Sequence, residues 1–250
     1  MSHNPFATDA VASATQSIQS SVRSGVPASA VYEGKITAAY LIKNNYDASK
    51  DDLAVHIELN NGYEYKIQKT VLKDNSPMAV NSKTGKTELL FTYQQIAHIV
   101  GAATDGKTLG DLFSSIEVKK IKLYDFESKS EVLTDVNMVS DLVGRTLIIG
   151  LQRKIANKRQ QVDGEWIDLP ERRESLEFGV AASSADRRTF NEMNQNVPVE
   201  AAKDVAAWEK RNAGKDWDAY KEVAPTTGGV PAGVPAAGAS TGQVHDFGSS

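Results

Sequence analysis

The most constraining feature of this sequence is a strict alternation of apolar and other residues on either side of a short turn. Apolar side chains occupy every second position of residues 53–59 (LAVHIEL) and again of residues 63–68 (YEYKIQ). A period of two is typical of strands with one buried face, and the intervening Asn60-Asn61-Gly62 is typical of a turn. The sequence therefore predicts a β-hairpin.

The register of this hairpin follows from the length of its loop, because a slip of one residue would turn one apolar set to the opposite face. A three-residue loop pairs Leu59 with Tyr63 and keeps the other apolar residues of the two strands together. A two-residue loop would place Leu59 opposite Glu64. We predict the three-residue loop, with Gly62 in a left-handed conformation.

Further periodic segments predict a mainly β protein with a few short helices. Strand patterns cover residues 31–43, 116–124, 132–139, 147–151 and 176–180. Residues 93–114 predict two short helices split at 101–107, and a later helix is predicted from Pro198, with Ala201, Val205 and Trp208 on one face. The polar segment 73–87 predicts a long hairpin-type loop, and the basic stretch that surrounds Trp166 predicts a polar loop. About seven strands with few helices indicate an antiparallel barrel.

Composition divides the chain into four parts. Residues 1–29 are rich in Ser and Ala and predict a flexible N-terminal arm, because they carry too little apolar surface to offset the entropy of ordering. Residues 30–182 form the predicted β domain, and residues 183–223 a C-terminal helical extension. Residues 224–250 are rich in Gly, Pro and Ala and predict a disordered tail.

Charge and residue usage narrow the function classes. The chain has no cysteine and no run of eighteen apolar residues, so we expect no disulfide framework, no membrane partner and a cytoplasmic location. Its net charge of −4 argues against non-specific binding of duplex DNA, which usually needs a strong basic excess. A channel for one nucleic-acid strand needs only a basic stripe.

One segment matches the phosphate-loop pattern of nucleotide hydrolases. Residues 101–108 (GAATDGKT) have a glycine, four further residues and then Gly-Lys-Thr. Such a loop must follow a buried parallel strand, whereas residues 93–100 carry apolar side chains at helical spacing. Residues 121–125 resemble the strand that carries the magnesium-binding carboxylate in such enzymes. Lys122, however, interrupts the apolar run that is expected of a buried parallel strand. A helix-to-helix loop is the favoured interpretation, with a nucleotide hydrolase as a minor alternative.

Other catalytic signals are weak. The histidines His3, His56, His98 and His245 lie far apart, and none is paired at helical spacing. No Gly-x-Ser-x-Gly nucleophile motif is present. We therefore expect no metal, no cofactor and no enzymatic activity.

Basic residues interleaved with aromatic ones give the strongest functional signal, because binding of a single nucleic-acid strand needs cations for phosphates and rings for bases. The candidate DNA-binding residues are Tyr63, Tyr65, Lys66, Lys69, Lys73, Lys83, Lys86, Arg145, Arg153, Lys154, Lys158, Arg159 and Trp166. Tyr63 and Tyr65 share the Leu/Val/Ile face of their strand, so core packing is an equal alternative for both. For residues 153–159 a solvated loop is as consistent as a phosphate-binding one.

The chain also resembles the single-stranded DNA-binding proteins of tailed phages, particularly short-tailed ones. The resemblance rests on short motifs spread over residues 4–217: Asn4-Pro5-Phe6-Ala7, residues 31–36 (VYEGKI), Ala39-Tyr40, residues 62–65 (GYEY), Tyr124-Asp125-Phe126 before Lys129, Glu131-Val132, Leu142-Val143-Gly144, and Trp208 followed by residues 211–215 (RNAGK). It implies an OB-fold that binds single-stranded DNA without sequence preference during phage replication and recombination.

This resemblance sets further expectations. It places the protein in the host cytoplasm, with replication proteins as partners of the C-terminal tail and a homo-oligomer as a possible assembly. Related tails are often acidic with a terminal aromatic residue, whereas this one offers Asp246-Phe247 before Gly248-Ser249-Ser250. A phage structural or assembly module that binds protein through the same kind of barrel is the alternative function.

Overall fold

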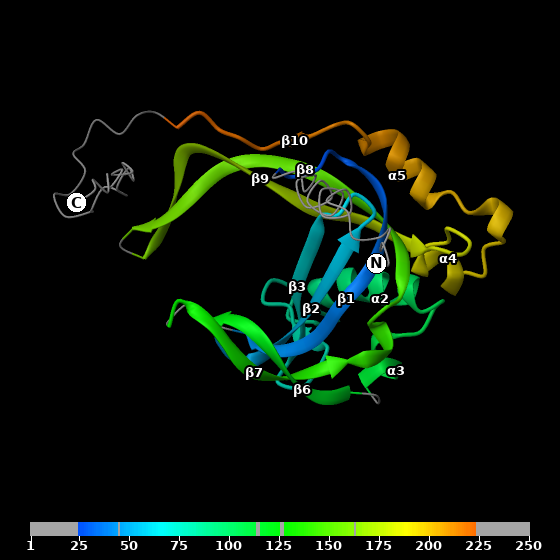
Figure 1. The fold of residues 1–250 in the computed structure, drawn as a ribbon, viewed down its shortest axis with the longest axis horizontal. Coiled ribbons are helices and arrows are strands. Elements are labelled where there is room, and N and C mark those ends of the chain that lie inside the picture. Colours follow the sequence, from blue (N-terminus) through cyan, green and yellow to red (C-terminus); the bar gives the residue numbers. More distant parts are fainter. Residues whose placement is uncertain (1–24, 45, 114–115, 126–127, 163, 224–250) are drawn as a thin grey trace, which may run out of the picture.

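The protein is a mainly β structure built on one large sheet (Figure 1). The computed structural model describes residues 25–44, 46–113, 116–125, 128–162 and 164–223. The predicted tail 224–250 and most of the predicted N-terminal segment 1–29 therefore lie outside the described residues. Within these ranges an eight-stranded sheet is accompanied by a separate two-stranded ribbon and a few short helices. No helix in these ranges is long and apolar enough to cross a membrane.

The large sheet contains β1 (Ala30–Asn44), β2 (Asp47–Leu59), β3 (Glu64–Lys73), β6 (Ile116–Asp125), β7 (Ser130–Val139), β8 (Thr146–Val162), β9 (Glu165–Ser183) and β10 (Trp217–Asp218). The ribbon consists of β4 (Met78–Val80) and β5 (Thr87–Leu89). The helices are α2 (Phe91–Ala103), α3 (Leu109–Leu112), α4 (Phe190–Asn194) and α5 (Asp204–Asn212), with short 3₁₀ turns at η2 (Ser140–Leu142) and η3 (Val199–Ala201).

β1 organises the sheet because it changes partners along its length. β2 follows one edge of β1, while β8 pairs with residues 30–35 on the other edge and β7 pairs with Tyr40 and Leu41. A register shift between Ile36 and Ala38 marks a bulge in the strand, and a bulge bends a strand and increases its twist. The hairpins β8–β9 and β6–β7 therefore leave β1 at different points, with β1, β2 and β3 between them (Figure 1).

The predicted hairpin at the centre of the sheet is confirmed. The backbone N–H of Leu59 donates to the carbonyl of Tyr63 at 2.9 Å, and Ile57 lies opposite Tyr65. Gly62 has a φ of +80°, the left-handed conformation that the three-residue loop requires.

The mainly β, antiparallel architecture with short helices is confirmed, whereas a closed barrel is not. β3 and β9 form two edges of the sheet, and no ladder joins them in the described part of the chain. The sheet is therefore an open, curved one.

The main core lies on one face of this sheet. Ile36, Leu53 and Ile149 from the strands meet Ile99 of α2 and Leu109 of α3, and all five are fully buried. A smaller cluster covers part of the opposite face of β1 and β2, where Tyr40 and Ala54 pack against Val136 and Met138 of β7. The β6–β7 hairpin is thus attached by its own apolar contacts.

Two predicted loops contain strands. Residues 73–87, predicted as a long hairpin-type loop, include the ribbon strand β4, the turn that follows it and the first residue of β5, so the hairpin is present although its strands were not predicted. The basic stretch around Trp166 forms the end of β8 and the start of β9, so the predicted strands 147–151 and 176–180 are only parts of strands with 17 and 19 residues. Residues 147–151 are the buried part of β8, whereas 176–180 are mostly half-buried and precede the buried residues 181–183 of β9. Beyond the core both faces of these strands meet solvent, so the sequence lacks the apolar alternation that predicts a strand.

The C-terminal extension is only partly helical. The helix predicted from Pro198 begins at Asp204, and Val205 and Trp208 are buried as predicted, whereas Ala201 lies in η3 and is exposed. After α5 the chain becomes extended and runs along β8, with Trp217 opposite Lys154 in a short parallel pair.

Candidate nucleic-acid interface

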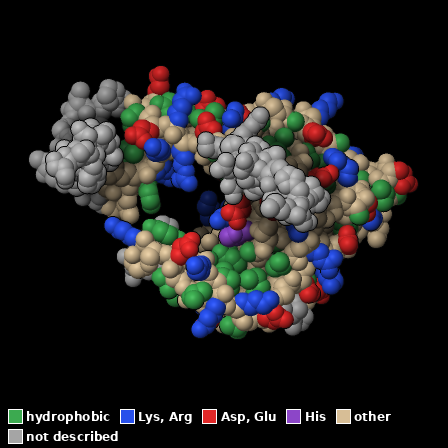
Figure 2. Space-filling view, viewed as in Figure 1, with side chains coloured by type: hydrophobic (Ala, Val, Ile, Leu, Met, Phe, Trp, Pro, Cys, Tyr) green, Lys and Arg blue, Asp and Glu red, His purple; other side chains and the backbone are tan. Residues whose placement is uncertain are grey.

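A hollow lies between the two hairpins. In the space-filling view it separates the part of the molecule formed by β8 and β9 from the part formed by β6 and β7, and Lys and Arg side chains line its upper margin (Figure 2). The strands β1, β2 and β3 lie between the hairpins. A chain-like ligand could therefore contact β8–β9, β1–β3 and β6–β7 at once.

The face of β1–β3 opposite the main core carries a polar network. Tyr40 Oη lies 3.2 Å from His56 Nε2, and His56 Nδ1 lies 3.2 Å from Glu64 Oε1. The ammonium of Lys66 contacts the other carboxylate oxygen of Glu64 at 3.0 Å. Burial and the nearby Lys66 lower the pKa of His56, although Glu64 opposes this shift, so the imidazole is neutral at pH 7. Lys66 and Glu64 then form an ion pair beside the neutral imidazole.

A buried carboxylate stiffens the same face. Asp52 accepts hydrogen bonds from Asn44 Nδ2 at 3.0 Å, from Gln68 Nε2 at 3.0 Å and from Thr70 Oγ1 at 2.8 Å. These donors come from β1 and β3 on either side of β2, so one side chain ties the three strands together. Charge-assisted hydrogen bonds of this kind are stronger than neutral ones.

We call the outer half of the β8–β9 hairpin the arm, and we include in it residues 214–221, which run beside this hairpin. Its described residues are 152–162, 164–177 and 214–221. The basic side chains of β8 are each paired with an acid: Arg153 with Asp216, Lys154 with Glu177 at 3.2 Å, Lys158 with Glu171, and Arg159 with Asp168 at 3.1 Å. These partly exposed pairs are individually weak, so phosphate groups could replace the carboxylates.

Three aromatic rings on the arm each lie against a basic side chain. The guanidinium of Arg159 lies 6.0 Å from the ring centre of Trp166, and that of Arg172 lies 4.6 Å from Tyr220. The ammonium of Lys154 lies 4.2 Å from the ring of Trp217. Trp166 and Trp217 are 58% and 47% exposed, so both rings are open to a ligand.

Residues 214–221 are held in place by a few well-defined hydrogen bonds. The N–H of Gly214 donates to the carbonyl of Ser29 at 2.7 Å. The buried amide of Asn157 accepts from the Lys221 N–H at 2.8 Å and donates to the carbonyls of Lys221 and Leu169. We call residues 214–221 the strap, because they cover the edge of β8 beyond Leu151, where the pairing of β8 with the first residues of β1 stops.

The arm brings together five of the predicted site residues, namely Arg153, Lys154, Lys158, Arg159 and Trp166. Sequence reasoning missed the two rings of the strap, Trp217 and Tyr220. Residues 215–221 (KDWDAYK) carry the same mixture of rings and charges that identified the other candidates, but they were assigned to a helical extension.

The remaining predicted site residues are dispersed. Tyr65 lies in the main core, where burial raises its pKa, and Tyr63 is half-buried against the same core, so the core alternative holds for both. Lys66 lies on the opposite face of β3 from Tyr65. The others lie in the second half of β3 (Lys69, Lys73), at the tip of the ribbon (Lys83, Lys86) and just before β8 (Arg145).

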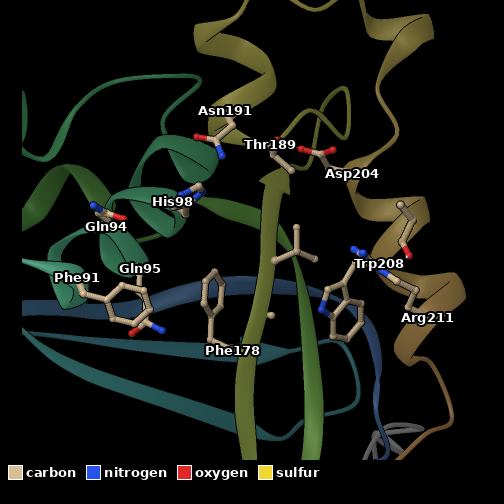
Figure 3. A pocket seen from close by; sticks show the side chains of 13 residues that line it. Phe91, Gln94, Gln95, His98, Phe178, Thr189, Asn191, Asp204, Trp208 and Arg211 are labelled. Carbon is tan, nitrogen blue, oxygen red and sulfur yellow. Dashed lines mark hydrogen bonds between the residues drawn. The ribbon is translucent and has the colours of Figure 1, made fainter.

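A second concave site lies between α2 and α5 over β9 (Figure 3). Its volume is 370 Å³, and Gln95 and His98 of α2 face Trp208 and Arg211 of α5 across Phe178. Burial lowers the pKa of His98, whose ring meets Phe190 edge-on. The lining mixes amides and rings with Thr189 and Asp204, and the hydroxyl of Thr189 donates to the carboxylate of Asp204 at 3.1 Å. The same hydroxyl accepts from the Glu192 N–H as the cap of α4.

The phosphate-loop pattern does not form a phosphate cradle. Gly101 lies inside α2, where an added Cβ would lie 2.0 Å from the ring of Phe190, and the residues before it are helical. The N–H of Gly106 donates to the carbonyl of Gly101, which closes the end of the helix. Asp125 ends β6, an edge strand antiparallel to β7. The strand–loop–helix geometry of nucleotide hydrolases is therefore absent from this described segment.

The described residues contain no group of three His, Asp or Glu side chains that could hold a metal ion.

Comparison of the sequence with protein-family models and with curated proteins gave no match. The resemblance to phage single-stranded DNA-binding proteins therefore stays a prediction from short motifs.

Proposed function

We propose that this protein binds single-stranded DNA without sequence preference, on the arm and along the hollow beneath it, and that it acts without catalysis in phage DNA replication and recombination. The observation that carries this proposal is the set of three rings on the arm, each with a Lys or Arg against it. Bases stack on such rings, while the neighbouring cations are placed to contact phosphates.

The paired charges of the arm favour a single strand over a duplex. Each β8 cation from Arg153 to Arg159 has a carboxylate partner, so the arm presents no broad basic surface to a rigid double helix. Unpaired bases can instead reach the rings, and this stacking contribution is independent of net charge.

We interpret the curved sheet as an open OB-type barrel. β1, β2, β3, β8 and β9 would supply its five strands, α2 would cover its core side after β3, and β6–β7 would be an added hairpin. In this arrangement β1–β3 and the flanking hairpins form the binding side, which agrees with the position of the hollow.

Binding can be tested by fluorescence anisotropy with labelled oligo-dT and with a duplex of equal length, each at two salt concentrations. We expect clear preference for the single strand and a modest loss of affinity at higher salt, because few phosphates are contacted. Equal affinity for both DNAs, or no binding to either, would contradict the proposal and favour a module that binds protein.

Ring variants locate the site. Trp166→Ala and Trp217→Ala should each weaken oligo-dT binding by about 1–3 kcal/mol, the range for loss of one stacked base. Phe91→Ala is the matched control, because Phe91 is 72% exposed at the start of α2 and lies outside the arm. If all three variants bind as the native protein does, the arm is not the DNA site.

A further inference from the structure

The face of β1–β3 opposite the main core holds one histidine between a hydroxyl and a carboxylate. His56 of β2 lies 3.2 Å from Tyr40 Oη through its Nε2 atom and 3.2 Å from Glu64 Oε1 through its Nδ1 atom. Only 19% of the His56 side chain is exposed. The imidazole is therefore held in a fixed position by a neighbour from β1 and a neighbour from β3.

These two neighbours suit both the neutral and the protonated ring. The carboxylate of Glu64 can only accept, so in the neutral ring Nδ1 carries the hydrogen and Nε2 accepts from the hydroxyl of Tyr40. When Nε2 takes up a proton, the hydroxyl of Tyr40 turns and accepts instead, because a tyrosine hydroxyl serves as donor or acceptor. Proton uptake by His56 therefore needs no movement of the strands.

Glu64 is shared between the imidazole and a lysine. Its second carboxylate oxygen lies 3.0 Å from the ammonium of Lys66, whose side chain is 58% exposed. Burial and, after it, the charge of Lys66 lower the pKa of His56, whereas Glu64 raises it. The protonation of His56 therefore depends on which anion the ammonium of Lys66 contacts.

The other charges on this face leave the surroundings of His56 close to neutral. Glu58, the next residue of β2 on the same face, lies opposite Lys35 of β1 and Glu64 of β3. Asp52, further along β2, is occupied by its three hydrogen bonds from β1 and β3. The β6–β7 hairpin, which packs against Tyr40, adds two apolar side chains and one ion pair, namely Val136, Met138 and Lys119 with Glu117. A proton on His56 is thus not opposed by an excess of positive charge.

We propose that binding of a DNA phosphate at Lys66 is coupled to uptake of one proton by His56, so that the protein holds single-stranded DNA more tightly at lower pH. This inference rests on the proposed function, which brings a DNA strand along β1–β3. A phosphate competes for the ammonium of Lys66 because partly exposed ion pairs such as Lys66 with Glu64 are weak. The phosphate then neutralises the charge that opposed protonation of the ring, while Glu64 stays beside it. With a proton taken from solvent, two ion pairs replace one: Lys66 with phosphate, and His56 with Glu64.

The direction of the pH effect follows from this exchange. In the free protein the pKa of His56 lies below its ordinary value of 6.5, and in the complex it is higher. The complex therefore binds more protons than the free protein does, so affinity rises as the pH falls through the range between these two pKa values and is constant well above it. A rise of the pKa by one on binding corresponds to a gain in affinity of at most about tenfold.

Fluorescence anisotropy with labelled oligo-dT from pH 8 to pH 5.5, at constant ionic strength, tests the coupling. The native protein should bind more tightly at pH 5.5 than at pH 8, by up to about tenfold. His56→Gln keeps a polar side chain beside Tyr40 and Glu64 but cannot take up the proton, so it should bind with a much smaller pH dependence. His98→Gln is the matched control, because it removes the other histidine of the described residues, between α2 and α5, and should retain the native pH dependence.

Calorimetric titration near pH 6.5 in two buffers with different ionisation enthalpies counts the protons taken up on binding. His56→Gln and Lys66→Gln should each take up fewer protons than the native protein, whereas Lys210→Gln, at an exposed position of α5, should match it. Native binding that is equally tight at every pH would overturn this inference alone, and so would native proton uptake in His56→Gln. A native protein that binds no oligo-dT at any pH would overturn the proposed function as well.

Discussion

Two glycines determine how the C-terminal helix docks on the sheet. The indole of Trp208 on α5 covers Gly150 of β8 and Gly179 of β9. A Cβ added at Gly179 would lie 2.2 Å from the indole nitrogen, and one at Gly150 would lie 2.8 Å from the ring. The absence of side chains at both positions therefore allows α5 to bury Trp208, which is only 8% exposed.

Gly179→Ala should destabilise the protein by forcing Trp208 away from β9. Overpacking of this kind costs about 1–3 kcal/mol, because neither the strand backbone nor the buried ring can move freely. Urea denaturation followed by far-ultraviolet circular dichroism measures the change. Gly110→Ala is the control, since its added Cβ would meet no atom closer than 3.7 Å, and a similar loss in both variants would contradict this explanation.

His98 should make stability depend on pH. Burial lowers its pKa below the ordinary value of 6.5, so the unfolded chain binds a proton more readily than the folded protein does. The free energy of unfolding therefore falls as the pH drops below 6.5, by at most about 1.4 kcal/mol per pH unit for one proton. His98→Gln should show a smaller difference in urea stability between pH 7 and pH 5.5. An unchanged difference would show that other groups cause the dependence.

At the scale of elements, the strands that could be predicted from the sequence are those with one buried face. The hairpin formed by β2 and β3 could be predicted with its register, because one face is buried and the apolar alternation has a single solution. The arm could not, because residues 158–162 are exposed on both faces and their pairing depends on main-chain hydrogen bonds. The ribbon was predicted only as a hairpin-type loop for the same reason, because its two short strands are largely exposed.

The candidate site was predictable only where rings and cations are close in sequence. Trp166 and Arg159 belong to one hairpin, so their shared basic stretch identified both. Trp217 meets Lys154 only because the strap returns along β8 after α5, and no local pattern encodes that return. Tyr65 was a candidate that the structure places in the core. The alternation assigned it to the apolar face of its strand, but this pattern alone could not exclude base stacking.

The ion pairs of the arm should restrain DNA binding. Glu171→Gln removes the carboxylate that pairs with Lys158, so that lysine becomes available to a phosphate. We expect higher affinity for oligo-dT and a salt dependence that is steeper by about one counterion. Lys158→Gln should give the opposite change in both quantities. Anisotropy titrations at several salt concentrations measure them, and equal slopes for the two variants would place Lys158 outside the site.

At the scale of the whole molecule, the strap connects regions that are distant in sequence. Ser29 lies near the start of the described residues. Its carbonyl accepts a hydrogen bond from the Gly214 N–H, and its hydroxyl accepts one from the Arg153 N–H at 2.9 Å. The guanidinium of Arg153 binds Asp216, and this contact lowers the pKa of that carboxyl. Residues near the two ends of the described chain therefore meet on β8, and the strap rings owe their positions to these contacts.

Asn157→Ala should release the outer end of the strap. Asn157 is buried, and its amide makes three hydrogen bonds to the backbone of Lys221 and Leu169, so the substitution leaves these groups unpaired at a cost of about 1–3 kcal/mol. Hydrogen exchange should quicken at the amides of Ala219 and Lys221 while the amides of β2 and β3 stay protected. Asn137→Ala, at an exposed position of β7, is the control and should change neither region.

The same substitution connects the strap to DNA binding. If the strap positions Tyr220 against Arg172, its release should weaken oligo-dT binding more than the control substitution does. The effect should be smaller than removal of a ring, because a released ring can still reach the strand at an entropic cost. Faster exchange in the strap with unchanged DNA affinity would show that the strap protects the edge of β8 without taking part in the binding surface.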